Sequence, residues 1–222
     1  MMPDVKMNPW MKIPLSDYEG HMSMTTVGQA QMLSDIFADM LNRYLPDSVA
    51  MLGCSGGNGF DHTRRSSVTR VVGIDINPEY IERTRTRYGR SVPSLELFCG
   101  DIESDAFAFK PVDLVFAGLV FEYVEGRKVL CRIRNMMNPG GVLVAILQLP
   151  ATDMGKITPS PYKSLELLET SMSLVEPEKF IKLAESCGFY RDEAQIRNSI
   201  GRKEFLIIHF HLESAESGSQ GS

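Results

Sequence analysis

Short apolar runs rich in β-branched residues recur along the middle of the chain, separated by stretches long enough for helices or turns. They span residues 49–53, 71–76, 95–98, 114–119 and 142–149. Continuous apolar runs of this length are typical of strands buried on both faces, and such strands pair in parallel when helices connect them. The rhythm therefore predicts an α/β fold, with a mainly parallel sheet covered by helices on both sides.

Helix signals lie around and between these runs. An amphipathic helix is expected to start at Thr26, its N-cap, and to stop before Pro46. Further helices are predicted over residues 78–88, 125–137 and 177–187. Two last apolar runs, at residues 193–197 and 205–212, are separated by a turn at residues 198–201, which predicts a terminal hairpin.

The domain organisation follows from length and pattern. A chain of 222 residues with 43% hydrophobic residues is long and apolar enough for one domain with additional segments. Residues 1–25 show no clean period and are interpreted as an N-terminal lid segment, followed by the domain itself over residues 26–213. Within it, the proline-containing residues 151–175 are expected to form a substrate-side insertion. The small polar residues 214–222 are typical of a disordered tail.

Charge and cysteine usage restrict the possible partners. The net charge of -5 argues against a nucleic-acid partner, because domains that bind nucleic acid usually carry a basic excess. The four cysteines, at positions 54, 99, 131 and 187, are far apart and are interpreted as reduced thiols. Neither a signal peptide nor an apolar run of membrane-spanning length is visible. We therefore expect a cytoplasmic protein without a membrane partner, its oligomeric state open.

A glycine cluster follows the first apolar run, in the stretch "SVAMLGCSGGNGF". Gly53, Ser55, Gly57 and Gly59 are small enough to let a ligand touch the backbone at the carboxyl edge of a parallel sheet, where the strand is expected to turn sharply into a helix. Asp75 ends the next run, at about the distance at which an acid binds ribose hydroxyls in nucleotide-binding βαβ units. The pattern therefore predicts a ligand that contains a ribose.

A dinucleotide is the first candidate for that ligand. Its fingerprint is G-x-G-x-x-G, but Ser55 and Asn58 stand where the second and third glycines are required. S-adenosylmethionine (SAM), which offers an adenosine and an amino-acid carboxylate, is the second candidate and needs no phosphate site.

The order of motifs resembles that of the class I SAM-dependent methyltransferases. The stretches "VAMLGCSGGNG", "VVGIDINPEYI", "CGDIES", "DLVFAGLVFEYV" and "MNPGGVLVAIL" are similar to successive motifs of that family, over roughly residues 48–149. The resemblance implies a three-layer Rossmann-like fold, whose seven-stranded, mainly parallel sheet has an antiparallel last strand. It also implies transfer of a methyl group from SAM, which leaves S-adenosylhomocysteine (SAH). The chain departs from the family at Met51, where an acid is common, and at Ser55, where glycine is usual.

The resemblance also implies a set of cofactor contacts. The implied contacts lie beneath the methionine and ribose portions of SAM, beside its adenine, or facing its sulfonium. They are Gly53, Cys54, Ser55, Gly57, Asp75, Ile76, Asp101, Ile102, Ala117 and Gly118. Taken singly, Asp75 could cap the following helix and Asp101 could lie in an ordinary turn. A small-molecule acceptor is expected from the size and acidity of the chain.

Candidate catalytic residues precede the first long helix and follow the fourth apolar run. His21 has a side chain suited to general base catalysis near neutral pH, and Tyr18 could contact the cation or the methionyl carboxylate. Packing of the N-terminal segment is the simpler interpretation of both residues. Glu122 is the third candidate, and it could equally belong to the start of the next helix.

Other features are assigned no site. His209 and His211 share a strand face, but no third metal ligand is evident, so exposed strand histidines are expected and no metal is predicted. Two other functions stay open, an NAD-dependent oxidoreductase and a non-catalytic protein that binds SAM or SAH.

Overall fold

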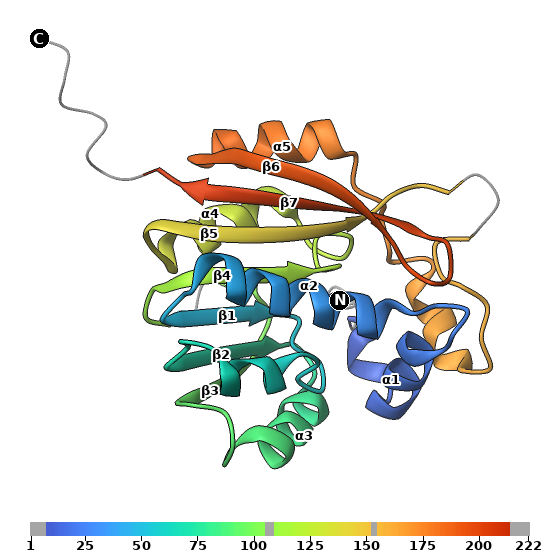
Figure 1. Cartoon of the computed structure of the whole chain (residues 1–222). Helices are drawn as coiled ribbons and strands as arrows, with labels where there is room; N and C mark the ends of the chain where they lie inside the picture. The colour runs from blue at the N-terminus through green and yellow to red at the C-terminus, as the bar shows by residue number, and fades with distance from the viewer. Residues whose placement is uncertain (1–7, 105–108, 152–154, 214–222) are drawn as a thin grey trace, which may run out of the picture.

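The computed structural model describes residues 8–104, 109–151 and 155–213, and seven strands in this part of the chain form one sheet (Figure 1). The order across the sheet is β3-β2-β1-β4-β5-β7-β6. The strands are β1 (Ser48–Leu52), β2 (Arg70–Asp75), β3 (Leu95–Cys99), β4 (Val112–Gly118), β5 (Met137–Gln148), β6 (Phe189–Asn198) and β7 (Glu204–Leu212).

The first five strands are parallel to one another, whereas β7 runs antiparallel to both of its neighbours, β5 and β6. This confirms the predicted mainly parallel sheet with an antiparallel last strand. Because β7 is reversed, its first residues lie at the carboxyl edge of the parallel strands, where Phe205 pairs with Gln148. The turn between β6 and β7 therefore reaches the edge at which ligands bind in such sheets.

Helices cover both faces of the sheet and bury apolar side chains against it. They are α2 (Gln29–Tyr44), α3 (Pro78–Tyr88), α4 (Gly126–Asn135) and α5 (Pro177–Ser186), while α1 (Leu15–Ser23) lies over the carboxyl edge of the sheet. The buried faces of α2 and α3 share one core cluster with β1 and β4, and those of α4 and α5 share a second cluster on the opposite face. The result is the three-layer arrangement that the sequence predicts.

Three local features differ from the expectations. Residues 15–23 form a helix, although they lie in a segment without a clean period. The expected helix after the glycine cluster is replaced by a short 3-10 helix, η2 (Phe60–Arg65). The start of α2 lies at Gln29 rather than near Thr26, because Gly28 adopts a left-handed conformation with φ 63° and interrupts the helical path.

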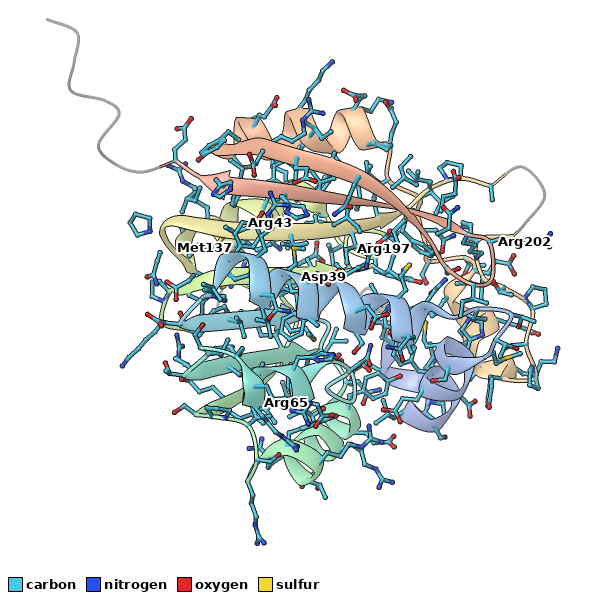
Figure 2. The ribbon with its side chains drawn as sticks, viewed as in Figure 1. Asp39, Arg43, Arg65, Met137, Arg197 and Arg202 are labelled. Carbon is cyan, nitrogen blue, oxygen red and sulfur yellow. The ribbon has the colours of Figure 1, made fainter. Side chains whose placement is uncertain are left out.

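Exposed ion pairs connect α2 to β6. Arg43 Nη1 lies 2.5 Å from Glu193 Oε2, and Arg197 Nη2 lies 3.1 Å from Asp39 Oδ2 (Figure 2). Ion pairs with this much solvent exposure contribute little to stability. We therefore infer that they mainly orient α2 on the β6–β7 hairpin.

His209 differs from the exposed strand histidine that the sequence suggests. Its side chain is fully buried between β7 and α2, where Nδ1 lies 2.6 Å from Tyr44 Oη. His211 is partly exposed, and its Nε2 lies 3.5 Å from Asp192 Oδ2. The expectation of exposure is therefore wrong for His209, because α2 covers that strand face.

Two segments far apart in sequence lie together over the carboxyl edge of the sheet. One is residues 8–28 and the other is residues 157–172, and we call them together the cover (Figure 1). The buried side chains of Ile13, Leu165 and Leu168 form a small apolar cluster between them. At Gly20 a Cβ would lie 2.3 Å from the ring of Tyr162, so close contact between the segments requires glycine there.

Within the described residues, no helix combines the length and the apolar character that crossing a membrane requires.

Candidate functional site

A cavity lies between the cover and the carboxyl edge of the sheet. Its wall combines the glycine turn after β1, the ends of β2 and β4, and side chains of the cover. Predicted site residues that line it are Tyr18, His21, Gly53, Ser55, Asp75, Ile76, Asp101, Ile102 and Gly118. Topology thus brings most of the predicted site to one place, because the carboxyl ends of parallel strands share one edge.

The turn after β1 has left-handed residues at three alternate positions. Gly53 has φ 62°, Ser55 has φ 49° and Gly57 has φ 83°. A Cβ on Gly57 would lie 2.6 Å from the Tyr88 ring, whereas one on Gly53 would meet Val120 at 3.2 Å, at the cavity wall. The glycines therefore permit the turn and keep the backbone at Gly53 accessible from the cavity.

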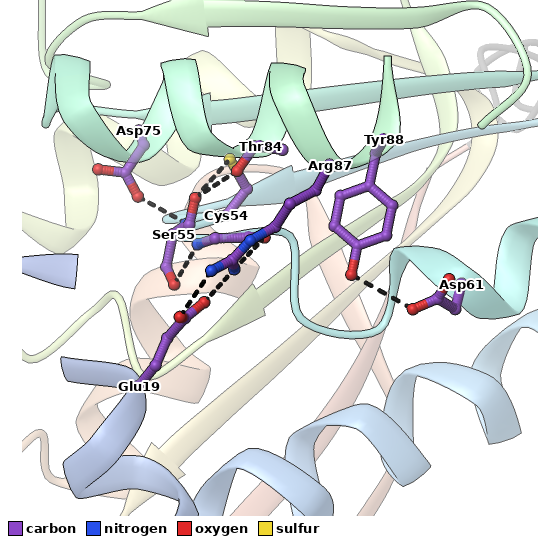
Figure 3. Close-up of polar contacts among 9 residues, drawn as sticks. Glu19, Cys54, Ser55, Asp61, Asp75, Thr84, Arg87 and Tyr88 are labelled. Atoms are coloured by element: carbon purple, nitrogen blue, oxygen red, sulfur yellow. Dashed lines mark hydrogen bonds and ion pairs between the residues drawn. The ribbon is translucent and has the colours of Figure 1, made fainter. Parts of the chain in front are cut away.

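Ser55 adopts an unusual conformation for serine and is held in it by hydrogen bonds (Figure 3). Its backbone N–H donates to Asp75 Oδ2 at 2.8 Å, and its carbonyl accepts a bond from Thr84 Oγ1 at 2.7 Å. Its own hydroxyl oxygen accepts the Gly56 N–H at 2.5 Å. These bonds fix the turn without a second glycine.

Asp75 is the buried carboxylate of the site. Oδ2 accepts the Ser55 N–H at 2.8 Å, and Oδ1 accepts the Asn77 N–H at 2.9 Å. The Ile76 N–H also interacts with this carboxylate, whose two oxygens offer about four acceptor sites, so acceptor capacity remains for a ligand hydroxyl. Burial raises the pKa of Asp75 to about 6, although the backbone hydrogen bonds oppose that shift. The group is therefore mainly ionised at neutral pH and suited to a vicinal diol.

The cover is tied to the glycine turn and to α3. The Glu19 carboxylate of α1 pairs with the Arg87 guanidinium of α3, and Arg87 Nη1 also donates to the Gly56 carbonyl at 3.2 Å (Figure 3). Farther along the cover, the Ile13 carbonyl accepts the Tyr80 hydroxyl at 3.0 Å. The cover is thus fastened to the sheet edge on the side of β2.

Asp101 and Ile102 follow β3 on the same side of the cavity. Ile102 is buried, whereas the exposed Asp101 accepts the Glu103 N–H on Oδ1 at 2.8 Å. That bond is the ordinary turn contact considered as the alternative for Asp101, and it leaves the other carboxylate oxygen available to a ligand.

Tyr18 and His21 both reach the cavity from α1. Tyr18 stacks on Tyr80, with ring centroids 6.2 Å apart, and burial followed by the charge of Asp75 raises the pKa of its phenol. It therefore stays protonated near neutral pH. Burial, followed by the charge of Lys203, lowers the pKa of His21, so its imidazole is neutral near pH 7. His21 Nδ1 lies 3.0 Å from Ser160 Oγ.

Glu122 does not line this cavity. It lies in a neighbouring hollow, where Oε1 accepts the Gln148 N–H at 2.7 Å and burial raises its pKa to about 7. Cys54, Gly57 and Ala117 also lie behind the cavity wall rather than on it. The structure thus brings Tyr18 and His21 together and places Glu122 apart from them.

Several cavity residues lie outside the set of predicted site residues. Trp10 and Tyr123 form an edge-to-face pair with ring centroids 5.1 Å apart, and Gln148 and Lys203 are buried at the end of β5 and the start of β7. Gln148 stands at the carboxyl end of a predicted strand, which is the position rule that could have found it. Lys203 follows a predicted turn, and only the reversed direction of β7 brings it to this edge.

Comparison with known proteins supports the resemblance. A family model described as a methyltransferase domain matches residues 50–145. No curated protein matches the sequence of the chain. Similar solved structures include magnesium protoporphyrin IX methyltransferase from Synechocystis PCC 6803 with bound SAH, at 12% identity and a TM-score of 0.62, covering 84% of this chain and 84% of that one.

Two further structures show the same fold. A TehB-like SAM-dependent methyltransferase from Corynebacterium glutamicum is 17% identical, with a TM-score of 0.55 and coverage of 80% of this chain and 87% of that one. The N-methyltransferase NodS from Bradyrhizobium japonicum is 16% identical, with a TM-score of 0.58 and coverage of 82% and 97%.

Proposed function

We infer that this chain, which carries a class I methyltransferase domain, uses SAM to methylate a small-molecule acceptor. The observation that supports this best is the junction of the glycine turn with Asp75. The turn leaves the Gly53 backbone accessible, and the Asp75 carboxylate keeps acceptor capacity for a ligand hydroxyl beyond its bonds to backbone N–H groups. These are the features that an adenosyl group with an attached amino acid requires.

The roles of the residues follow from their positions in the cavity. Asp75 would accept the ribose hydroxyls, while Ile76 and Ile102 would cover the adenine. When bound, SAM supplies an activated methyl group, so the main tasks of the protein are alignment of the acceptor and exclusion of water. Tyr18 and other rings of the cover would exclude water. If the acceptor attacks through a hydroxyl or an amine, the neutral imidazole of His21 would take its proton.

A small acceptor fits the way in which the cavity is covered. Side chains from both segments of the cover line it, including Trp10, Leu165 and Leu168. A macromolecule would have to displace these packed segments. The acidic net charge of -5 also disfavours a nucleic acid as the acceptor.

Calorimetric titration with SAH tests the cofactor site. Asp75→Ala should weaken binding by about 10- to 150-fold, because loss of a charged hydrogen-bond acceptor costs roughly 1.5–3 kcal/mol. Asp75→Asn keeps the size of the side chain and separates the loss of charge from loss of packing. Asp113→Asn is the matched control, since that aspartate bonds Ser48 and Asn138 at the opposite end of β4.

The outcomes separate the possible functions. Full SAH affinity in Asp75→Ala would contradict the assigned pocket, and binding of NAD in place of SAH would favour an oxidoreductase. SAH release in the presence of SAM and a panel of small acceptors would establish catalysis. SAH binding without turnover on a broad panel would instead identify a non-catalytic binding protein.

A further inference from the structure

Lys203 lies at the end of the cavity beside β5 and β7. It immediately precedes β7, and its neighbour in the turn, Arg202, is drawn at the tip of the β6–β7 hairpin (Figure 2). Sheet neighbours are about 4.8 Å apart, so the start of β7, three strands from β1, lies roughly 14 Å along the edge from the glycine turn. This position is beyond Gly118, on the opposite side of β1 from Asp75 at the end of β2.

The ammonium of Lys203 is buried with little compensation. The residue is 2% exposed, and its Nζ donates to the Lys156 carbonyl at 2.5 Å. An ammonium carries three donor hydrogens, and among the described residues no carboxylate pairs with this one. Burial lowers its pKa to about 8, which still leaves most of the group charged at pH 7. A buried charge of this kind calls for an anionic partner.

Charged groups are segregated along the cavity. The acidic side chains on its described wall are Asp75 and Asp101, both on the side of β2 and β3. Lys156 and Lys203 are the lysines on this wall, on the side of the cover and the β6–β7 hairpin, and the neutral imidazole of His21 also reaches the cavity from the cover. The charge of Lys203 contributes to the lowered pKa of His21, which indicates that these two groups lie close together. The acidic end suits a ribose, and the basic end suits an anion.

Much of the cavity wall is apolar. The apolar side chains that the cover and the segments after β4 contribute to it are Trp10, Met22, Leu119, Tyr123, Ile157, Leu165, Leu168 and Met172. A ligand that fills this space therefore needs an apolar body as well as a charged group.

We propose that the methyl acceptor is a small organic acid, whose carboxylate binds the ammonium of Lys203 while its apolar body packs against the cover. This inference rests on the proposed function, because it concerns the acceptor side of the same cavity. Gln148, which is buried beside Lys203 and donates to the same Lys156 carbonyl at 3.0 Å, lies at this end of the wall. A hydrogen bond between a charged donor and a charged acceptor in such a site is among the strongest that proteins make.

The test compares acids with their neutral amides on protein saturated with SAH. The probes are phenylacetate, cinnamate and 4-hydroxybenzoate, each paired with its primary amide, and ligand-observed NMR gives the affinities. At least one acid should bind wild-type protein ten times more tightly than its amide. Lys203→Met should lower the affinity for that acid to the level of its amide and leave SAH affinity unchanged. Lys203→Arg should keep most of the preference for the acid.

Arg202→Met is the matched control, because it removes an exposed cation one residue away and should keep the full preference for the acid. Equal binding of acids and amides to wild-type protein, a measurement that needs no variant, would overturn the inference. So would an acid preference that survives Lys203→Met, or a tenfold loss of SAH affinity in that variant, which would assign the lysine to the cofactor. Absence of SAH binding to wild-type protein would instead count against the proposed function.

Discussion

Ser55 shows how single residues maintain the glycine turn after β1. At φ 49° a serine is strained by roughly 1–2 kcal/mol relative to a right-handed conformation. Hydrogen bonds to Asp75 and Thr84, together with the bond of its own hydroxyl, offset that cost. The departure from glycine at this position is therefore compatible with the expected turn.

Glu122 makes stability depend on pH. Burial raises its pKa in the folded protein to about 7, above the ordinary value of 4.5, so the folded state binds the proton more tightly than the unfolded state. The stabilisation that comes from this tighter proton binding is therefore complete below pH 4.5 and is lost as pH rises through 7. The free energy of unfolding falls by on the order of 3 kcal/mol over that range. We expect Glu122→Gln to show a smaller fall in unfolding free energy between pH 5 and pH 8, measured by urea denaturation.

The control for this prediction is Glu125→Gln, which removes an exposed acid that caps α4 through the Arg127 and Lys128 N–H groups. It should lower stability at both pH values by a similar amount. Asp75 acts in the same direction as Glu122, since its pKa rises from 3.8 to about 6, and it remains in every variant. Parallel pH curves for Glu122→Gln and wild-type protein would show that Glu122 is not titrating as described.

Among single residues, the local sequence predicted those that lie in a strand or directly after one. Gly53, Ser55 and Asp75 were found because a glycine-rich turn and the next strand end have a fixed spacing. The partners of Ser55 were not predicted, since Thr84 lies 29 residues away in sequence. Lys203 was not predicted either, because its place in the cavity depends on strand order and direction across the whole sheet.

Elements with a strong hydrophobic period were predicted well. The bounds of α3 match the prediction, since Asn77 caps it and Pro78 occupies its first turn. In contrast, α1 was missed because its buried side chains, Leu15, His21 and Met22, do not form a continuous apolar stripe. Its helical form depends on contacts with the rest of the cover, which the period of a single segment does not record.

The end of α2 offers a stability test. Leu45 terminates that helix at φ 45°, with its N–H donating to the Leu41 carbonyl at 3.1 Å and its side chain 66% exposed. Glycine adopts this conformation without the Cβ penalty, and little buried surface would be lost. Leu45→Gly should therefore raise the free energy of unfolding by on the order of 1 kcal/mol, measured by urea denaturation.

Leu45→Ala is the matched control for the helix end. It shortens the side chain but retains a Cβ in the left-handed conformation, so no comparable gain is expected. A stability of Leu45→Gly at or below that of Leu45→Ala would mean that backbone strain at this residue is negligible.

For the whole molecule, the cover is a separate packing unit on a larger core. Its apolar cluster of Ile13, Leu165 and Leu168 is distinct from the two clusters that flank the sheet. Small clusters of this kind open more readily than a central core, and ligand-binding segments are often of low local stability. We therefore expect the two segments of the cover to open together, without unfolding of the sheet.

Hydrogen exchange on Ile13→Ala tests that expectation. Removing a buried isoleucine side chain leaves a cavity that costs about 2–5 kcal/mol, here confined to the cover. Amides in residues 9–23 and 163–172 should exchange faster together, while those of β1, β4 and β5 remain protected. Ile133→Ala, in the core beneath α4, is the matched comparison and should expose the strands. Faster exchange throughout the sheet in Ile13→Ala would contradict an independent cover.

Because β7 is reversed, the two ends of the pocket are formed by parts of the chain that lie far apart in sequence. The Asp75 side of the pocket is encoded between β1 and the end of β4, whereas the hairpin before β7 joins the wall from a distant part of the sequence. A parallel β7 would have left residues 199–203 at the opposite edge. In the proposed methyltransferase, lengthening or exchanging that hairpin should therefore change the choice of acceptor while the Asp75 side of the pocket stays untouched, which makes this loop the natural starting point for redesign.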